Sequence, residues 1–152
     1  MREVVQEVRR HWPDRYPLFV RISSTEYTKG GWDIEQSVEL VRALRPLGVD
    51  LIDCSSGGNI ATAKIPVGPG FQVPFAERIR KDTGILTGAV GMITEPQQAN
   101  EIVTTGQADI VLLARQMLRD AYWPLHAAQE LGHTISWPAQ YLRAAPQGSP
   151  AR

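Results

Sequence analysis

The strongest constraint on the fold of this chain is a fourfold alternation of short apolar runs with helix-like segments. Each run is only a few residues long and is dense in aliphatic side chains, which is typical of strands buried on both faces of a parallel sheet. Successive runs begin about 25 to 35 residues apart, the scale of one strand–helix repeat. Four strands are therefore predicted, over Pro17–Ile22, Val49–Cys54, Gly84–Val90 and Asp109–Ala114.

The segments between these runs carry helical patterns and helix end signals. In the first, Val38, Val41 and Leu44 recur every three residues between charged positions, and Gly48 follows as a helix C-terminal signal. In the third, Thr94 is predicted to be the N-cap of a helix whose first turn contains proline. The predicted helices cover residues 34–47, 74–81, 96–105 and 122–131.

This order of segments predicts an α/β fold in which helices cover a parallel sheet. A doubly wound sheet and a (β/α)₈ TIM barrel both satisfy the pattern, and four units make half of such a barrel, which needs about 250 residues. The chain has 152 residues, which fits one domain. We expect residues 1–14 to be the end of a preceding barrel helix, residues 15–134 to form four βα units, and residues 135–152 to form a C-terminal tail.

Composition excludes several classes of function. Sixteen basic and sixteen acidic residues cancel, so neither a nucleic acid nor an anionic membrane is an expected partner. No apolar run approaches the roughly 20 residues of a membrane span. The start of the chain lacks the apolar core of a signal peptide, and a cytoplasmic location is expected. The single cysteine, Cys54, excludes an internal disulfide and a multi-cysteine metal site, and the three histidines lack metal-ligand spacing, so no metal is expected.

One connection is anomalous in length. The segment between Ser55 and Val73 is about nineteen residues long, whereas βα loops usually have about 2 to 6. Long loops in compact domains are often functional. Cys54, just before this loop, has no evident activating partner and is expected to be a small buried filler.

The ends of the last two predicted strands are candidates for an anion site. Small residues near Gly91 and at Ala114 let backbone N–H groups approach a phosphate closely, and a helix that opens there adds its own N–H groups. Arg115 adds a planar, permanently charged donor group suited to phosphate oxygens. In the alternative interpretation, Gly91 only turns the chain and Arg115 caps a surface helix.

Arg21 is the second informative residue, because a charge next to an apolar run is costly to bury unless it is paired. One interpretation is an ion pair with Glu26 or Asp53 at the rim of the barrel. The other is a positive charge directed at an electron-rich ligand. The residues alone leave both open.

Several segments recur in the order of a known family. They are Phe19–Ser23, Gly48–Asp53, Gln72–Ala76, Thr87–Thr94, Ala108–Asp109, Leu118–Asp120 and Pro138–Tyr141. Together they resemble the old yellow enzyme family of FMN-dependent ene-reductases, and most of all its branch of bacterial NADPH dehydrogenases and xenobiotic reductases. The resemblance covers the chain from about residue 17 to 143 and implies the C-terminal half of the barrel.

The resemblance implies roles for five residues. Arg21 matches an arginine that contacts the flavin ring near N1 and O2, and Gly91 and Arg115 match the FMN phosphate site. Ala114 stands where the family usually has glycine, a replacement that alanine permits unless the site needs positive φ. Arg143 resembles a C-terminal arginine that reaches into the neighbouring subunit, which implies a homo-oligomer. FMN and NADPH are the implied cofactors, and an enone or similar activated alkene is the implied substrate.

The catalytic groups of the family have no match here. In the family, a His/His or His/Asn pair holds the substrate carbonyl and a tyrosine donates the proton, and both belong to the N-terminal half. We therefore expect the C-terminal portion of an FMN-dependent NADPH:acceptor oxidoreductase, contributing ring and phosphate contacts without turnover of its own. The alternatives are a non-catalytic half-barrel that self-associates and a barrel like dihydroorotate dehydrogenase, against which Gln72–Ala76 and Pro138–Tyr141 argue.

Overall fold

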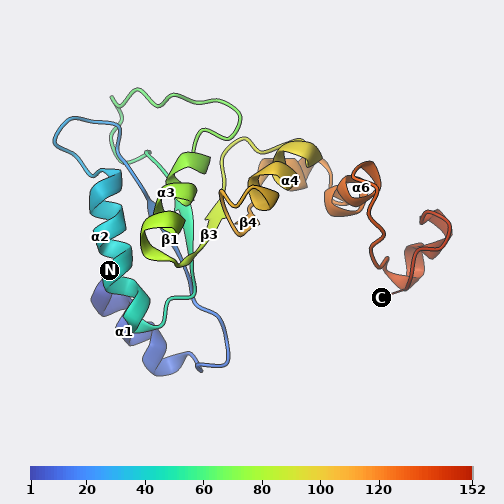
Figure 1. The fold of residues 1–152 in the computed structure, drawn as a ribbon, viewed down its shortest axis with the longest axis horizontal. Coiled ribbons are helices and arrows are strands. Elements are labelled where there is room, and N and C mark those ends of the chain that lie inside the picture. The colour runs from blue at the N-terminus through green and yellow to red at the C-terminus, as the bar shows by residue number, and fades with distance from the viewer. Residues whose placement is uncertain (152) are drawn as a thin grey trace.

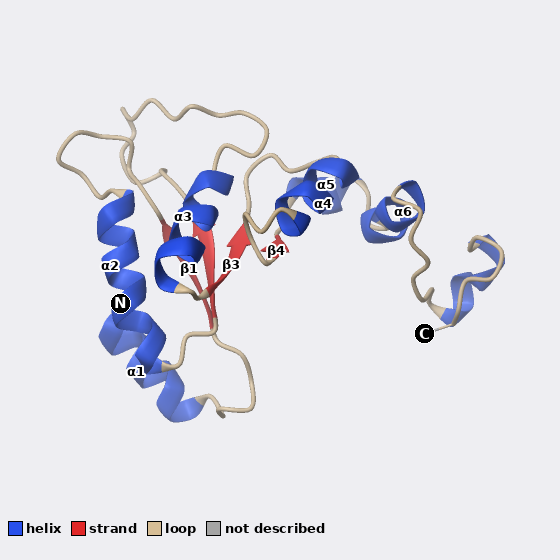
Figure 2. Cartoon of the chain, in the orientation of Figure 1, coloured by secondary structure: helices blue, strands red, loops and turns tan. Residues whose placement is uncertain are grey.

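The computed structural model describes residues 1–151 and has a parallel four-stranded sheet at its centre (Figures 1 and 2). The strands are hydrogen-bonded in chain order, β1-β2-β3-β4, with no reversal. A doubly wound sheet reverses its strand order at a switch point, so this order favours one wall of a barrel. The strands are β1 (Phe19–Ser23), β2 (Leu51–Ser55), β3 (Leu86–Ala89) and β4 (Ile110–Val111).

Helices connect and precede these strands. In Figure 1 the helices at the start of the chain gather on one side of the sheet, and the chain after α6 extends away from the sheet. No helix among residues 1–151 is long and apolar enough to cross a bilayer. The helices are α1 (Arg2–His11), α2 (Ile34–Leu44), η1 (Arg45–Leu47), α3 (Val73–Thr83), α4 (Pro96–Thr104), α5 (Arg115–Arg119), α6 (Trp123–Glu130) and η2 (Ala139–Ala144).

Local hydrogen bonds explain where the helices begin and end. The Asp33 side chain accepts from the Gln36 N–H at 2.9 Å, and the Gln36 side chain accepts from the Asp33 N–H at 3.1 Å, which makes a capping box for α2. Gly48, at φ +88°, ends the following turn as predicted. The prediction for Thr94 was wrong, because Glu95 is the N-cap of α4 and the Thr94 N–H instead donates to the Gln98 side chain.

One face of the sheet forms the core. The parallel register of β1, β2 and β3 places alternate side chains of all three strands on this face. Helix α3 packs against it, beside α2 (Figure 2). Burial of aliphatic side chains between sheet and helices is the main stabilising term of such a layer. The strand residues on this face, none more than 9 % exposed, are Val20, Ile22, Ile52, Cys54, Thr87 and Ala89.

The opposite face is uncovered, which corrects the expectation of strands buried on both faces. On this face Leu51 pairs with Phe19 of β1 on one side and with Leu86 of β3 on the other. Phe19 and Leu86 are each 53 % exposed. Arg21 and Asp53 follow on the same face, two residues along their strands. The described helices that contact the strands pack on the other side, so no described helix covers this face. Phe19, Leu86 and Arg21 are exposed on it, whereas Leu51 is 3 % exposed and the Asp53 side chain 14 %.

The buried thiol of Cys54 makes the free energy of unfolding depend on pH. Desolvation, and to a smaller extent the Asp53 carboxylate, raise its pKa from 9.0 to about 12. The unfolded thiol ionises first, so the contribution of this group to stability is intact below about pH 9 and is lost as the pH rises toward about 12. We expect the free energy of unfolding to fall by on the order of 2 kcal/mol more in the native chain than in Cys54→Ala between about pH 8 and about pH 10.5.

Urea unfolding followed by circular dichroism at each pH measures this difference. Effects of high pH elsewhere in the chain are common to both proteins, so they cancel in the comparison. Parallel pH profiles for the native chain and Cys54→Ala would contradict the assignment of a buried neutral thiol.

Candidate functional site

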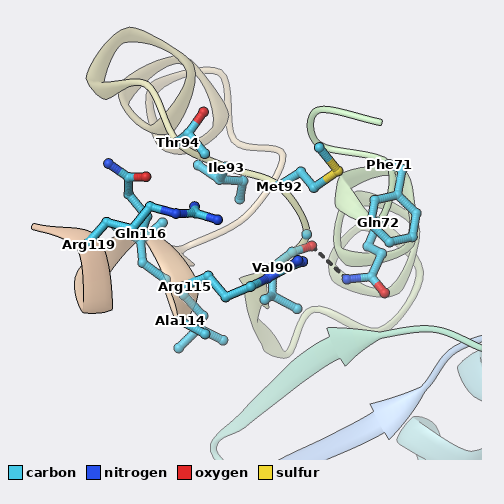
Figure 3. Close-up of a pocket in the computed structure, with 13 residues that line it drawn as sticks. Phe71, Gln72, Val90, Met92, Ile93, Thr94, Ala114, Arg115, Gln116 and Arg119 are labelled. Atoms are coloured by element: carbon cyan, nitrogen blue, oxygen red, sulfur yellow. Dashed lines mark hydrogen bonds between the residues drawn. The ribbon is translucent and has the colours of Figure 1, made fainter. Parts of the chain in front are cut away.

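A pocket of about 250 Å³ lies at the carboxyl ends of β3 and β4 (Figure 3). It is built by three segments far apart in sequence, namely the start of α3, the β3–α4 loop and the β4–α5 junction. Carboxyl ends of parallel strands meet at one edge of the sheet, and barrel enzymes place their sites there. Its lining is Phe71, Gln72, Val90, Gly91, Met92, Ile93, Thr94, Leu112, Leu113, Ala114, Arg115, Gln116 and Arg119.

The charge of this pocket is positive. Arg115 and Arg119 line it, and no carboxylate does. Neither guanidinium group forms an ion pair or hydrogen bond with another residue between 1 and 151. In Figure 3 the Arg115 side chain extends across the pocket toward Val90. Unpaired guanidinium groups without competing acids are suited to bind a phosphate or carboxylate.

The loop after β3 turns its N–H groups to one side. The Val90 carbonyl accepts from Gln72 Nε2 at 2.9 Å, and the Gly91 carbonyl accepts from the Gly70 N–H at 2.9 Å. A trans peptide directs its N–H opposite to its C=O. The N–H groups of Gly91 and Met92 therefore point away from α3, and they find no acceptor among residues 1–151. Successive N–H groups directed to one side make an anion-binding concavity.

Backbone conformation and space both require glycine at position 91. Its φ is +120°, and the next residue, Met92, also has a positive φ of 51°. A Cβ at Gly91 would lie 2.7 Å from Gln72 Nε2 and 3.0 Å from the Phe71 ring. The requirement for glycine at position 91 thus has two physical causes, its positive φ and its contact with Gln72 and Phe71, and the sequence did not indicate the contact.

The β4–α5 junction contributes the other side of the pocket. Ala114 has φ −112°, so alanine is compatible with a position where the resembling family usually has glycine. The N–H groups of Ala114 and Arg115 have no acceptor in the described chain. Since α5 is only five residues long, we attribute the positive potential to the arginine side chains and the loop N–H groups rather than to a helix dipole.

Arg21 lies on the uncovered face of the sheet, outside the lining of the pocket. Its Nε donates to Asp53 Oδ2 at 2.6 Å, so the predicted ion pair with Asp53 is present, and the one with Glu26 is not. Within residues 1–151 neither Nη group has a partner, and the Arg21 side chain is 60 % exposed. The ion pair and a ligand contact are therefore compatible, because pairing through Nε leaves both Nη groups free.

The other candidate residues fall into two groups. Gly91, Ala114 and Arg115 meet in one pocket, whereas Arg143 lies in η2 and lines none of it. Sequence reasoning used Gln72 only as part of a motif and missed its contacts, because a glutamine at a helix start carries no chemical signal by itself.

Comparison with known proteins places the chain among flavin enzymes. The sequence profile described as the NADH:flavin oxidoreductase / NADH oxidase family matches residues 1–133. The chain is 50 % identical over 144 residues to an NADPH dehydrogenase of Halalkalibacterium halodurans, covering 95 % of the chain and 42 % of that protein. It is 45 % identical over 143 residues to an NADPH dehydrogenase of Bacillus subtilis, covering 94 % of the chain and 41 % of that protein. The chain thus spans about two fifths of the length of these relatives.

Solved structures show the same fold. The chain superposes on 2-naphthoyl-CoA reductase with a TM-score of 0.74 at 23 % identity, covering 86 % of the chain and 20 % of that protein. On histamine dehydrogenase from Rhizobium sp. 4-9 the TM-score is 0.68 at 25 % identity, covering 86 % of the chain and 19 % of that protein. The predicted α/β class, as part of a (β/α)₈ barrel, is confirmed.

The two causes that require glycine at position 91 can be separated by mutation. Gly91→Ala adds left-handed strain and a steric clash, whereas Gly58→Ala adds strain alone, since Gly58 has φ +91° with nothing within 4 Å of a Cβ. We expect Gly58→Ala to lower the free energy of unfolding by about 1 to 2 kcal/mol and Gly91→Ala by about 1 to 3 kcal/mol more. Urea denaturation of both variants measures this, and equal losses would contradict the packing of Gly91 against Gln72.

Proposed function

Because the chain belongs to the NADH:flavin oxidoreductase / NADH oxidase family, we propose that it forms the FMN phosphate site of an FMN-dependent NADPH:acceptor oxidoreductase. The family match bears out the old yellow enzyme resemblance and the predicted cofactor pair, FMN and NADPH. The observation that carries the proposal is the pocket itself, which combines the unpaired Arg115 with free N–H groups at Gly91 and Met92.

The pocket fits a phosphate better than other parts of a nucleotide. A phosphate monoester presents several strong acceptor oxygens and no donor when fully ionised, and this site offers donors without a carboxylate. Arg115 would supply charge and a planar donor pair, while Gly91, Met92 and Ala114 would supply directed N–H groups. A volume of about 250 Å³ holds the phosphate and the start of a chain attached to it, so the flavin ring would lie outside the pocket.

Arg21 is proposed to contact that ring from the uncovered face of the sheet. Its free Nη groups would place a fixed positive charge beside the part of the flavin that becomes anionic on reduction. FMN supplies hydride transfer between NADPH and an acceptor when bound. The proposed acceptor is an enone or similar activated alkene, and Arg143 is proposed to reach the site of a neighbouring subunit in a homo-oligomer.

A second candidate function has one observation in its favour. The face with Phe19 and Leu86 is uncovered, and within residues 1–151 neither β1 nor β4 has a second strand beside it. Two copies related by rotation about the barrel axis would place β4 of one beside β1 of the other, both parallel, and close eight strands without an edge. This would be a non-catalytic half-barrel that self-associates. A visible flavin band in the purified chain favours the first candidate, and a stable colourless dimer favours the second.

Arg115 should discriminate FMN from riboflavin, which lacks the phosphate. We expect the chain to bind FMN more tightly than riboflavin, and Arg115→Ala to weaken FMN binding by about 10-fold while leaving riboflavin unchanged. Arg42→Ala, an exposed arginine on α2 paired with Glu39, is the matched control and should change neither. Flavin fluorescence titration measures all six affinities, those of the three proteins for FMN and for riboflavin. Equal losses for both ligands would contradict a phosphate role for Arg115.

Turnover by the chain itself is not expected, because no carbonyl-binding pair or proton donor of the family has a match in it. With FMN and NADPH supplied, the rate of NADPH oxidation should not rise on addition of cyclohexenone. The assay follows NADPH absorbance, with the same mixture lacking protein as the control. Protein-dependent, cyclohexenone-dependent oxidation would show that the chain carries its own reaction groups.

A further inference from the structure

Gln72 is a buried polar side chain that links the end of β2 and the loop after it to the loop after β3. It is 5 % exposed and precedes α3 as its N-cap, yet its side chain makes no capping hydrogen bond. A buried amide needs partners for its oxygen and its nitrogen. The oxygen faces the loop after β2, and the nitrogen faces the loop after β3.

These hydrogen bonds run in one direction, from Ser56 through Gln72 to Val90. Ser56 Oγ donates to Gln72 Oε1 at 2.7 Å, and Gln72 Nε2 donates to the Val90 carbonyl at 2.9 Å. The Ser56 hydroxyl has one proton, so at its 2.8 Å contact with the Tyr27 hydroxyl it must accept. Because the Val90 carbonyl can only accept, the Gln72 amide faces one way, with its nitrogen toward Val90 and its oxygen toward Ser56.

We propose that Gln72 is a positioning residue that gives the pocket its preference for a phosphate. This inference rests on the proposed function. By holding the Val90 carbonyl, Gln72 keeps the N–H of the same peptide, at Gly91, directed away from α3. Packing adds to this, because Gly91 lies so close to Gln72 that a Cβ built there would be 2.7 Å from Gln72 Nε2.

The division of roles follows from the chemistry of the donors. Arg115 supplies charge, which attracts an anion over a range of positions. The Gly91 N–H supplies direction, and it is a useful donor only while its peptide is held in one orientation. Without the Gln72 donor, the Val90–Gly91 peptide is free to rotate, because the glycine tolerates many conformations. Affinity for the phosphate would then fall in part, while the rest of the flavin would be unaffected.

The test is the ratio of two affinities, riboflavin Kd divided by FMN Kd. Gln72→Met keeps the length of the side chain and removes both hydrogen bonds, and we expect the ratio to fall by about 5-fold. Gln97→Met, on the exposed face of α4, is the matched control and should leave the ratio unchanged. Ser56→Ala removes the closer donor to Gln72 Oε1 and leaves only Ser55 Oγ, at 3.5 Å, so the Gln72 side chain is held less firmly. It should lower the ratio in the same direction, and it remains informative if Gln72→Met does not fold.

The outcomes separate this inference from the proposal beneath it. A structural role alone would lower stability, or weaken both ligands together, and would leave the ratio unchanged in Gln72→Met and Ser56→Ala; that result overturns the inference. A native chain that binds FMN and riboflavin equally overturns the proposed phosphate site instead. A native preference for FMN that is lost in both variants and kept in Gln97→Met supports both.

Discussion

The site depends on two carbonyl groups at the end of β3 that are held from one side. The Val90 carbonyl is held by the Gln72 side chain and the Gly91 carbonyl by the Gly70 N–H, so the N–H groups of the same two peptides are presented on the other side. Glycine at 91 is what allows this, because no side chain fits between the loop and Gln72. Arg115 then faces a loop whose donors are already oriented, and little reorganisation is needed when an anion binds.

The fold brings these parts together through the parallel, sequential order of its strands. Each βα loop lies beside the next, so three successive connections form one hydrogen-bonded chain: Tyr27 from the first, Ser56 and Gln72 from the two ends of the second, and Val90 from the third. The helices hold the sheet from one face only. The other face keeps Arg21 accessible beside its largely buried partner Asp53, on the side where a barrel of this class has its interior.

Much of this architecture followed from sequence pattern. Dense apolar runs and helix signals located the four strands and α2, α3, α4 and α6, but they missed α5 and made β4 longer than its two residues. Family motifs singled out Gly91 and Arg115, which the fold brings into one pocket. Burial of both strand faces was wrongly predicted. A run of apolar residues shows that a strand can be buried, but it does not show which helices cover each face of the sheet. The cap at Thr94 was misplaced by one residue. The role of Gln72 was out of reach, since it depends on hydrogen bonds between loops distant in sequence.

The central claim is that the N–H groups of Gly91 and Met92 are the directed donors of an anion site. Amide NMR of the ¹⁵N-labelled chain, titrated with inorganic phosphate, FMN and riboflavin in turn, tests it most directly. The account predicts large downfield proton shifts at these two amides with phosphate and FMN, and small ones with riboflavin. Shifts confined to other residues, or equal with all three ligands, would contradict it.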